Sequence, residues 1–479
     1  MIELDKLFQT WSGAAAQEIK QLPISGSNRQ YFRLSGHGKS AIGVFNDDTK
    51  ENNAFVSFAE HFTKAKLNTP KIYLADLENN VYLQEDLGDL SLYKILNQKN
   101  ESGFDSELED WYKKSIAQLL KLQIEGSKKF DFGKCYPRDK FDAQSIQWDL
   151  NYFKYCFLKL ADIKFDEQLL ENDFNTLSNH LTNIPANHFM HRDFQSRNLM
   201  IDKDDVFIID FQGGRKGPLQ YDLVSLLFQA KANIPFEKRA ALLEYYLDQL
   251  IDISQDKKID RNKFKQDYYA IAFVRTMQVL GAYGFRGLFE KKAHFLQSIP
   301  FAINNLEWLI NNAAIDLKIP TLEKVWSQIL AHKQFRNLSY NPKDKLTVTI
   351  SSFSYRRGIP NDLSGNGGGF VFDCRSIHNP GRYEPYKKLT GRDEPVKEFL
   401  QSESKIENYL NPVFAMVDTA VQTYIDRNFQ HLMVSFGCTG GQHRSVYSCD
   451  SLAKHLSEKF DIEIKINHIE QELKNWING

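Results

Sequence analysis

The chain has 479 residues, more than the roughly 100 to 200 residues of a typical domain, so we expect two or three hydrophobic cores rather than one. Its 60 basic and 61 acidic residues nearly cancel, and 42% of its residues are hydrophobic, as in an ordinary globular protein. The balanced charge argues neither for nor against a nucleic-acid or acidic partner.

Localisation and redox chemistry are indicated by what the sequence lacks. It contains no run of about 18 apolar residues, and its start, "MIELDKLFQTWSG", does not have the basic and then apolar layout of a signal peptide. We therefore expect a cytoplasmic protein with no membrane segment. The five cysteines are scattered and never spaced as C-x-x-C, so we expect neither a disulfide framework nor a zinc site.

The first hundred residues predict strands with one helix among them. The strands are "QYFRL" (30–34), "SAIGVF" (40–45), "KIYLA" (71–75) and "VYLQED" (81–86), and the helix is "ENNAFVSFAEHFTKAKL" (51–67). From about residue 90 to 330 apolar residues recur at helical spacing. One interruption, "NLMIDKDDVFIIDFQ" (198–212), predicts a β-hairpin that turns at residues 203–205.

A polar stretch at residues 332–345 predicts a linker, and the pattern after it is different. Compact apolar runs at 346–353, 369–375, 431–437 and 462–468 alternate with helical patterns at 393–401, 407–428 and 442–459. This alternation predicts a smaller α/β domain with a mainly parallel sheet. We place the domain boundaries at 1–330 and 345–479, with a linker at 331–344.

The stretch "HRDFQSRNLM" (191–200) has the spacing H-R-D-x-x-x-x-N of a kinase catalytic loop, and "IIDFQ" follows it after the hairpin. Phosphoryl transfer needs a carboxylate to accept the proton of the attacking hydroxyl, and an amide and a second carboxylate to hold magnesium. We expect Asp193 to be the catalytic base and Asn198 and Asp210 to be the metal ligands.

Two upstream segments are candidates for ATP binding. The loop of Gly26, Ser27 and Asn28 lies between two strands, where its backbone amides can close over phosphates. The stretch "VYLQEDLGDLSL" (81–92) would be the hinge between lobes, with the backbone from Glu85 to Leu87 meeting adenine.

Together these features resemble the aminoglycoside phosphotransferase and choline kinase superfamily over residues 1 to about 330. The resemblance implies a protein-kinase-like bilobal α+β fold that uses ATP and Mg²⁺. Three motifs, "HRDFQSRNLM", "IIDFQGGRKGPLQYDLVSLL" and "TMQVLGAYGF", are similar to those of AmgK-like kinases, which phosphorylate N-acetylmuramate or N-acetylglucosamine at C1 in cell-wall recycling. By this resemblance Asp222 would brace the catalytic loop at the substrate site, and Asp149 would lie beside the sugar.

One residue type expected of a kinase is missing. Most kinases hold a phosphate-binding lysine on the third strand, but "SAIGVFNDD" (40–48) has Asn46 or Asp47 in the corresponding stretch. The alternative hypothesis is therefore a non-catalytic regulator, in which an inactive kinase lobe and the C-terminal domain bind ligands and control a small RNA or a protein partner.

A second phosphate site is predicted by "VSFGCTGGQHRS" (434–445), where a strand ends at Gly437 and a helix is expected to begin near Gln442. Free amides at a helix N-terminus bind anions, and glycines allow the backbone to approach closely. Arg444 would add a bidentate grip. The spacing C-x-x-x-x-x-R also matches cysteine-dependent phosphatases, with Cys438 as the nucleophile and Asp373 or Asp393 as the acid.

Three ordered motifs, beginning "ISSFSYRRGIPND" (350–362), "VFDCRSIHNPGRY" (371–383) and "VSFGCTGGQHRS" (434–445), resemble the C-terminal domain of RapZ, an RNase adapter protein that senses glucosamine-6-phosphate and binds small RNA. The resemblance makes Cys438 part of a cradle rather than a nucleophile. It also implies amino-sugar-phosphate binding, and it allows RNA contacts by exposed basic residues and a homo-oligomer. The sugar-phosphate pocket would be lined by Asp373, Arg375, His378, Cys438, Thr439, Gly440, Gly441, His443, Arg444 and Ser445.

Overall fold

The computed structural model describes residues 2–23, 29–99, 103–254, 259–290, 292–313, 317–332, 335, 345–362, 368–426, 429 and 431–473. The chain divides into two compact units, one of residues 1–282 and 301–331 and the other of residues 283–300 and 332–479. The predicted linker 331–344 falls largely outside the described residues.

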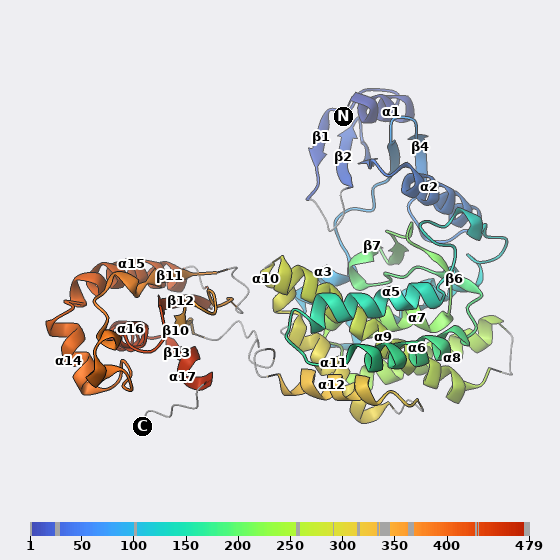
Figure 1. Cartoon of the computed structure of the whole chain (residues 1–479). Coiled ribbons are helices and arrows are strands. Elements are labelled where there is room, and N and C mark those ends of the chain that lie inside the picture. Colours follow the sequence, from blue (N-terminus) through green and yellow to red (C-terminus); the bar gives the residue numbers. More distant parts are fainter. Residues whose placement is uncertain are drawn as a thin grey trace. The chain divides into compact units, whose positions relative to one another are not determined.

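An antiparallel sheet of five strands forms the N-terminal part of the first unit, in the order β1-β2-β3-β5-β4 (Figure 1). Side chains alternate between its two faces, so that Leu34 of β2 and Ala41 of β3 are fully buried against Leu4 and Phe8 of α1 (Ile2–Ser12). The strands expected from the sequence are all present. The strands are β1 (Glu18–Gln21), β2 (Gln30–Gly36), β3 (Lys39–Phe45), β4 (Ile72–Asp76) and β5 (Val81–Glu85).

Helix α2 (Thr49–Lys64) links this sheet to the helical part of the same unit. Its start is fixed by Asp48, whose side chain accepts the backbone N–H of Glu51. Its buried face carries Phe58 and Phe62, both of which contact the ring of Phe189 in the helical part. The helix predicted at 51–67 is therefore confirmed, and aromatic packing sets its position.

The rest of the first unit is mostly helical, as the spacing of apolar residues predicts. The predicted hairpin is confirmed: β7 (Leu199–Asp202) pairs with β8 (Asp205–Ile208) in antiparallel register, and β6 (His188–Met190) pairs with β9 (Arg215–Gly217). No helix among the described residues combines the length and the apolar character that crossing a membrane requires. The helices and helical turns are α3 (Leu92–Gln98), α4 (Ser106–Ile124), η1 (Phe132–Lys134), α5 (Ala143–Phe153), η2 (Lys154–Leu158), α6 (Glu167–Thr182), η3 (Ser196–Asn198), α7 (Leu219–Leu227), η4 (Ala230–Ala232), α8 (Phe236–Ser254), α9 (Arg261–Tyr283), α11 (Ile299–Asn312) and α12 (Pro320–Ala331).

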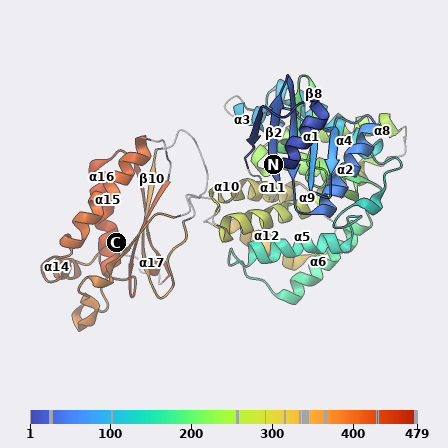
Figure 2. The ribbon, with the colours of Figure 1, turned by 90° about the horizontal axis from the view of Figure 1, so that it is seen from above.

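The C-terminal unit is built on a four-stranded sheet in the order β11-β12-β10-β13, and every strand pair in it is parallel. This confirms the predicted α/β architecture. Figure 2 shows α15 and α16 on one side of the sheet. Helix α16 begins at Arg444, two residues later than predicted. The elements are η5 (Gly284–Phe289), α10 (Ala293–Leu296), β10 (Thr347–Ser354), β11 (Phe370–Asp373), η6 (Cys374–Ser376), η7 (Pro380–Arg382), η8 (Glu384–Tyr386), α14 (Glu394–Ser402), α15 (Glu407–Asp426), β12 (His431–Cys438), α16 (Arg444–Lys459), β13 (Glu463–His468) and α17 (Ile469–Leu473).

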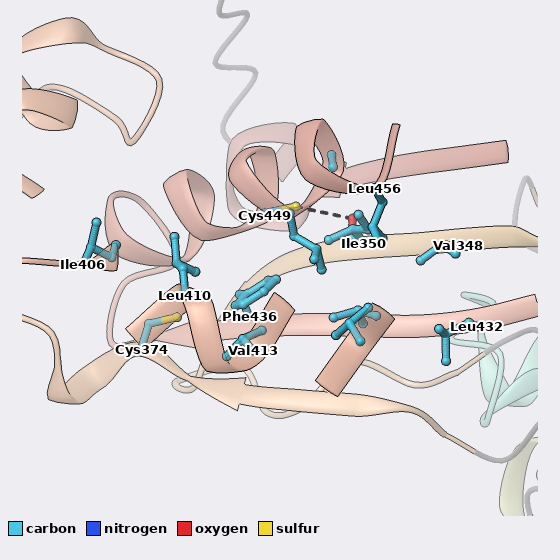
Figure 3. Packing of buried hydrophobic residues seen from close by; sticks show 14 of the residues in the cluster. Val348, Ile350, Cys374, Ile406, Leu410, Val413, Leu432, Phe436, Cys449 and Leu456 are labelled. Atoms are coloured by element: carbon cyan, nitrogen blue, oxygen red, sulfur yellow. Dashed lines mark hydrogen bonds between the residues drawn. The ribbon is translucent and has the colours of Figure 1, made fainter. Parts of the chain in front are cut away.

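The core of this second sheet lies between its strands and helices α15 and α16 (Figure 3). Ile350 of β10 and Phe436 of β12 have no exposed surface, and they pack in one cluster with Leu410 and Val413 of α15 and Leu456 of α16. Burial of these apolar side chains is the main favourable contribution to the stability of the unit. It fixes the strand ends at which the second predicted site lies.

The substitution Ile350→Ala should lower the free energy of unfolding of the C-terminal unit by about 2–5 kcal/mol, because it leaves a cavity in this core. Ile466 pairs with Ile350 on the neighbouring strand and is 40% exposed, so Ile466→Ala should cost less than about 1 kcal/mol. Urea denaturation of the full chain, read from hydrogen exchange of the β10 and β12 amides, measures both. Equal losses would contradict the core position of Ile350.

Candidate functional site

The catalytic loop brings Asp193 and Asn198 into direct contact. The Asn198 amide nitrogen donates to the backbone oxygen of Asp193 at 2.9 Å. The Asp193 side chain is about half exposed, at 47%, whereas Asn198 is buried as the last residue of η3. The loop therefore presents the Asp193 carboxylate to solvent and keeps Asn198 behind it.

His191 ties this loop to the segment that carries Asp210. Its Nδ1 accepts the backbone N–H of Asp193, so the ring proton is on Nε2, which donates to the Ile209 carbonyl at 2.9 Å. The Ile209 N–H in turn donates to the Asn198 carbonyl at 3.0 Å. The three residues predicted for catalysis and metal binding are thus connected by a short series of hydrogen bonds.

Asp222 of α7 supports the loop from below. Its carboxylate is fully buried and accepts the backbone N–H of His191 at 2.6 Å and that of Arg192 at 2.8 Å. Arg192 has φ of +77°, a conformation that costs a non-glycine residue about 1–3 kcal/mol. Asp222 therefore offsets this strain, and it lies behind the loop rather than facing the open site.

Arg275 of α9 is the main charged partner of Asp193. Its Nη2 lies 2.9 Å from the Asp193 Oδ1, and the arginine itself is only 4% exposed. Although the Asp193 side chain is half exposed, the protein around its carboxyl removes part of its hydration and so favours the neutral form. The positive charges of Arg275 and Arg197 outweigh this effect and lower the pKa of Asp193 below its ordinary value. Asp193 is therefore kept ionised, as a proton acceptor must be.

Asp149 of α5 belongs to a buried charged cluster beside the loop. Its Oδ1 accepts from Arg192 Nη2 at 2.9 Å, and Arg215 of β9 also contributes to its electrostatic environment. Burial raises the pKa of Asp149, and the arginines oppose this shift. The Asp149 Oδ2 and the Arg215 Nη1 are buried and lack a hydrogen-bond partner within the part of the chain that the structure describes.

The donor set near Asp210 fits a hard divalent cation such as Mg²⁺, which prefers oxygen ligands. Asn198 uses its nitrogen for the Asp193 carbonyl, and its Oδ1 accepts no hydrogen bond from a described residue. Gln212 donates to Asp210 at 3.0 Å, and its own Oε1 is buried without a partner among the described residues. Asn198 and Asp210 are therefore chemically suited to hold the cation.

Only some of the residues predicted to bind ATP belong to the described part of the chain. Gly26, Ser27 and Asn28 lie outside the described residues. Glu85 ends β5, and its N–H donates to the Lys71 carbonyl at 2.9 Å. Leu87 follows in the connecting segment to α3. Of Glu85 and Leu87, it is Leu87 that lies outside the sheet.

A cationic residue that the sequence patterns did not indicate lies beside Asp210. Arg29, only 5% exposed, contacts Glu51 of α2 at 2.6 Å and Asp210 at 3.2 Å. Asn46, which we expected in place of the kinase lysine, instead donates its amide to Glu51 at 2.9 Å. No local motif identifies Arg29, because its partners are 22 and 181 residues away.

In the C-terminal unit, the predicted cradle lies at the carboxyl ends of three parallel strands. Cys438 pairs with Ser354 of β10, and Gly437 pairs with Asp373 of β11. Cys438 is 3% exposed, and its Sγ lies 3.2 Å from the hydroxyl of Ser445. Ligands of parallel α/β sheets bind at this edge.

The loop after Cys438 contains exposed and buried residues in turn. Thr439 and Gly440 are exposed, whereas Gly441 is buried with φ of +63°. A Cβ on Gly441 would lie 2.4 Å from Glu470 Cγ, so only glycine fits there. The N–H groups of residues 440–442 have no acceptor among the described residues, which leaves them available to an anion.

Arg444 and His443 are turned toward the protein. Arg444 Nη1 donates to the carbonyls of Arg375 and Ile377 at 3.0 and 2.8 Å, and His443 Nε2 contacts the Tyr386 carbonyl at 2.9 Å. Nη1 of Arg444 therefore holds residues 375–377 in place, while its buried Nε has no hydrogen-bond partner among the described residues. The bidentate grip of Arg444 on a phosphate stays a prediction.

Arg375 is an exposed cation at this edge. Its guanidinium pairs with Asp373 at 2.7 Å and lies 4.0 Å from the ring centroid of Tyr355, and its side chain is 51% exposed. The hydrogen bond from Arg375 lowers the pKa of Asp373. His378 is exposed, and its ring lies 3.2 Å from the hydroxyl of Tyr383. Within the described part of the chain its side chain makes no hydrogen bond to a cradle residue.

Two family models match the chain. Residues 18–258 match the phosphotransferase enzyme family, and residues 346–472 match the RapZ C-terminal domain. Since the first match covers about half of the chain, the chain belongs to the phosphotransferase enzyme family. It carries a RapZ C-terminal domain after the phosphotransferase region.

The curated relatives of the chain include nucleotide-binding proteins of several bacteria. A nucleotide-binding protein of Endomicrobium trichonymphae is 35% identical over 153 residues, which is 32% of this chain and 49% of that protein. One of Acinetobacter baylyi is 36% identical over 133 residues, 28% of this chain and 44% of that protein. The chain thus spans about half the length of these relatives. A nucleotide-binding protein of Fusobacterium nucleatum is 27% identical over 304 residues, covering 57% of this chain and 99% of that protein.

Solved structures similar to the chain include kinases. An ethanolamine kinase of Plasmodium vivax superposes with a TM-score of 0.43 at 13% identity, covering 61% of this chain and 82% of that one. Amicoumacin kinase in complex with AMP-PNP, Ca²⁺ and Ami has a TM-score of 0.45 at 11% identity, covering 63% of this chain and 92% of that one.

The brace formed by Asp222 predicts a specific pH dependence. Burial raises the pKa of Asp222 to about 6 from an ordinary 3.8, so the folded state takes up a proton at a higher pH than the unfolded state does. The stability contributed by this group is therefore present at low pH and is lost as the pH rises through about 6. The stability advantage of the parent over Asp222→Asn, which cannot titrate, should be largest near the low end of this range.

Thermal unfolding of both proteins, measured at intervals between about pH 4 and 7, tests this. The difference in Tm should fall as the pH rises to about 6 and then stay constant. A difference that is the same at every pH would contradict the raised pKa of Asp222.

Proposed function

We propose that the chain is an ATP-dependent kinase that phosphorylates the anomeric hydroxyl of an N-acetylated amino sugar, of the N-acetylmuramate or N-acetylglucosamine type. We further propose that its RapZ C-terminal domain binds an amino-sugar phosphate. Membership of the phosphotransferase family supports the reaction class. The proposed acceptor and the proposed role of the C-terminal domain are inferred from the residues of the two sites.

The observation that carries the kinase proposal is the state of Asp193. It is half exposed, it is held ionised by Arg275, and its backbone contacts Asn198. A base in this position would accept the proton of the attacking hydroxyl as the phosphoryl group is transferred. Asn198 and Asp210 would hold Mg²⁺, which supplies positive charge to neutralise the phosphate oxygens.

The acceptor would lie beside the pair of Arg192 and Asp149. The Asp149 Oδ2 and the Arg215 Nη1 lack protein partners among the described residues, so a ligand with both hydroxyl donors and carbonyl acceptors would satisfy groups of both kinds. An N-acetylated sugar carries both. Its anomeric hydroxyl is also more acidic than its other hydroxyls, which suits a base whose pKa is lowered by arginine.

In the C-terminal domain, the free amides of residues 440–442 and the exposed cation of Arg375 would bind the phosphate of the ligand. Buried Cys438 would support this loop through its contact with Ser445 rather than attack phosphorus. Binding of RNA by basic surface residues is a less favoured function of this domain, because two of these residues already pair with carboxylates. Arg357 pairs with Glu470 at 2.9 Å, and Lys387 pairs with Glu384 at 2.5 Å.

The substitution Asp193→Asn should lower kcat by about 10²- to 10⁴-fold, because it removes the proton acceptor but keeps the shape of the side chain. ADP release in the presence of N-acetylglucosamine or N-acetylmuramate measures the rate, and phosphorus NMR should locate the phosphate on C1. Asp202→Asn, on the exposed end of the neighbouring hairpin, is the control and should retain the parent rate. A parent protein that binds ATP but phosphorylates no amino sugar would instead support the non-catalytic regulator.

In the C-terminal domain, Arg375→Gln should weaken binding of glucosamine-6-phosphate about 10- to 100-fold, since it removes a charged hydrogen-bond donor. Cys438→Ser should leave this affinity within about threefold, because serine can keep the contact with Ser445. Isothermal titration measures both, with the exposed Lys345→Gln as a control. Release of inorganic phosphate by the parent that Cys438→Ser abolishes would establish the phosphatase alternative.

A further inference from the structure

The guanidinium of Arg29 lies between two carboxylates, and its two edges have different partners. Nε and Nη2 donate to the Glu51 carboxylate at 3.3 and 2.6 Å. Nη1 donates to Asp210 and to the Tyr31 hydroxyl, each at 3.2 Å. One edge is thus fixed to α2, and the other faces the predicted metal ligand.

Glu51 is itself held firmly in this position. The Asn46 amide donates to its Oε2 at 2.9 Å, and the N-cap Asp48 accepts its backbone N–H at 3.1 Å. One turn later on the same helix, Phe55 stacks on Phe211, the residue after Asp210, with ring centroids 4.7 Å apart. The face of α2 that carries Glu51 is therefore packed directly against the segment of Asp210.

Strand β3 offers no other cation for this role. Its one lysine, Lys39, lies at the start of the strand, where its Nζ donates to the Ser12 carbonyl at 3.1 Å and lies 5.3 Å from the centre of the Trp11 ring. Kinases use a lysine paired with a glutamate of the first large helix to hold the nucleotide phosphates. Here the glutamate is present, and an arginine from the start of β2 is its partner.

We propose that Arg29 is the phosphate-binding cation of this chain, held by Glu51 so that its Nη1 edge contacts the nucleotide phosphates. This rests on the proposed kinase function for the presence of a nucleotide, but not on the identity of the acceptor. The guanidinium can exchange Asp210 for a phosphate oxygen without losing Glu51, because separate nitrogens make the two contacts. Its planar fork also suits bidentate binding of phosphate. Under this proposal, the missing β3 lysine is no evidence for an inactive kinase.

The test compares nucleotides with and without phosphates on the full chain. Affinities for Mg²⁺·AMP-PNP, ADP and adenosine are measured by isothermal titration for the parent, Arg29→Gln and Glu51→Gln. Arg29→Gln should weaken AMP-PNP and ADP binding roughly 10- to 100-fold, the loss expected for one or two hydrogen bonds to a charged group. Its affinity for adenosine should stay within about threefold of the parent, which a general loss of folding would not allow.

The matched control is Arg261→Gln, since Arg261 of α9 also joins two carboxylates, Glu244 at 2.7 Å and Asp248 at 2.8 Å, both on α8. It should leave all three affinities unchanged. Glu51→Gln keeps Arg29 but weakens the ion pair that holds its guanidinium, so it should also lower the affinity for AMP-PNP. If Arg29→Gln does not fold, Glu51→Gln serves as the test in its place. Parent-like AMP-PNP affinity in the folded variant would overturn the proposal. If the parent binds AMP-PNP but phosphorylates no amino sugar, the proposed kinase function fails, whereas these affinities still decide the role of Arg29 in nucleotide binding.

Discussion

The catalytic region depends on a buried carboxylate. Asp222 accepts two consecutive N–H groups of the catalytic loop and has no exposed surface. Unpaired, these buried donors would cost about 1–3 kcal/mol each, and Arg192 would have no support for its left-handed backbone. Helix α7, which supplies Asp222, is buried at every position from Gln220 to Leu227. The hydrophobic core thus determines where the reactive carboxylate of Asp193 lies.

In the C-terminal domain, too, buried elements set the position of a loop, but these elements are strands rather than a helix. Parallel strands β10, β11 and β12 end at the same edge, and the register Ser354 to Cys438 and Asp373 to Gly437 sets the loops side by side. There the backbone amides of a glycine loop replace the side chains that the kinase region uses. In both regions the rigid element is buried, and the groups that we propose to meet a ligand lie at its end.

Features encoded locally were predictable from the sequence. The alternation of apolar residues predicted the strands, the hairpin at residues 199–208 and the parallel sheet, and the spacing of His191, Asp193 and Asn198 predicted a shared loop. The ion partners were not predictable. Arg275 lies 82 residues from Asp193, and only the tertiary packing of α9 brings them together. The contacts of Arg444 Nη1 were not predictable either, because the carbonyls that accept from it belong to Arg375 and Ile377, 69 and 67 residues away.

Glu51 and Phe55 are four residues apart on α2, so they share one face of the helix. One of them holds Arg29, and the other stacks on the ring next to Asp210. An insertion of one residue before Glu51 would rotate this face by about 100° and break both contacts together. The connection between β3 and α2 therefore has a fixed length, and a rotation of α2 about its axis would displace Arg29 and the segment of Asp210 together.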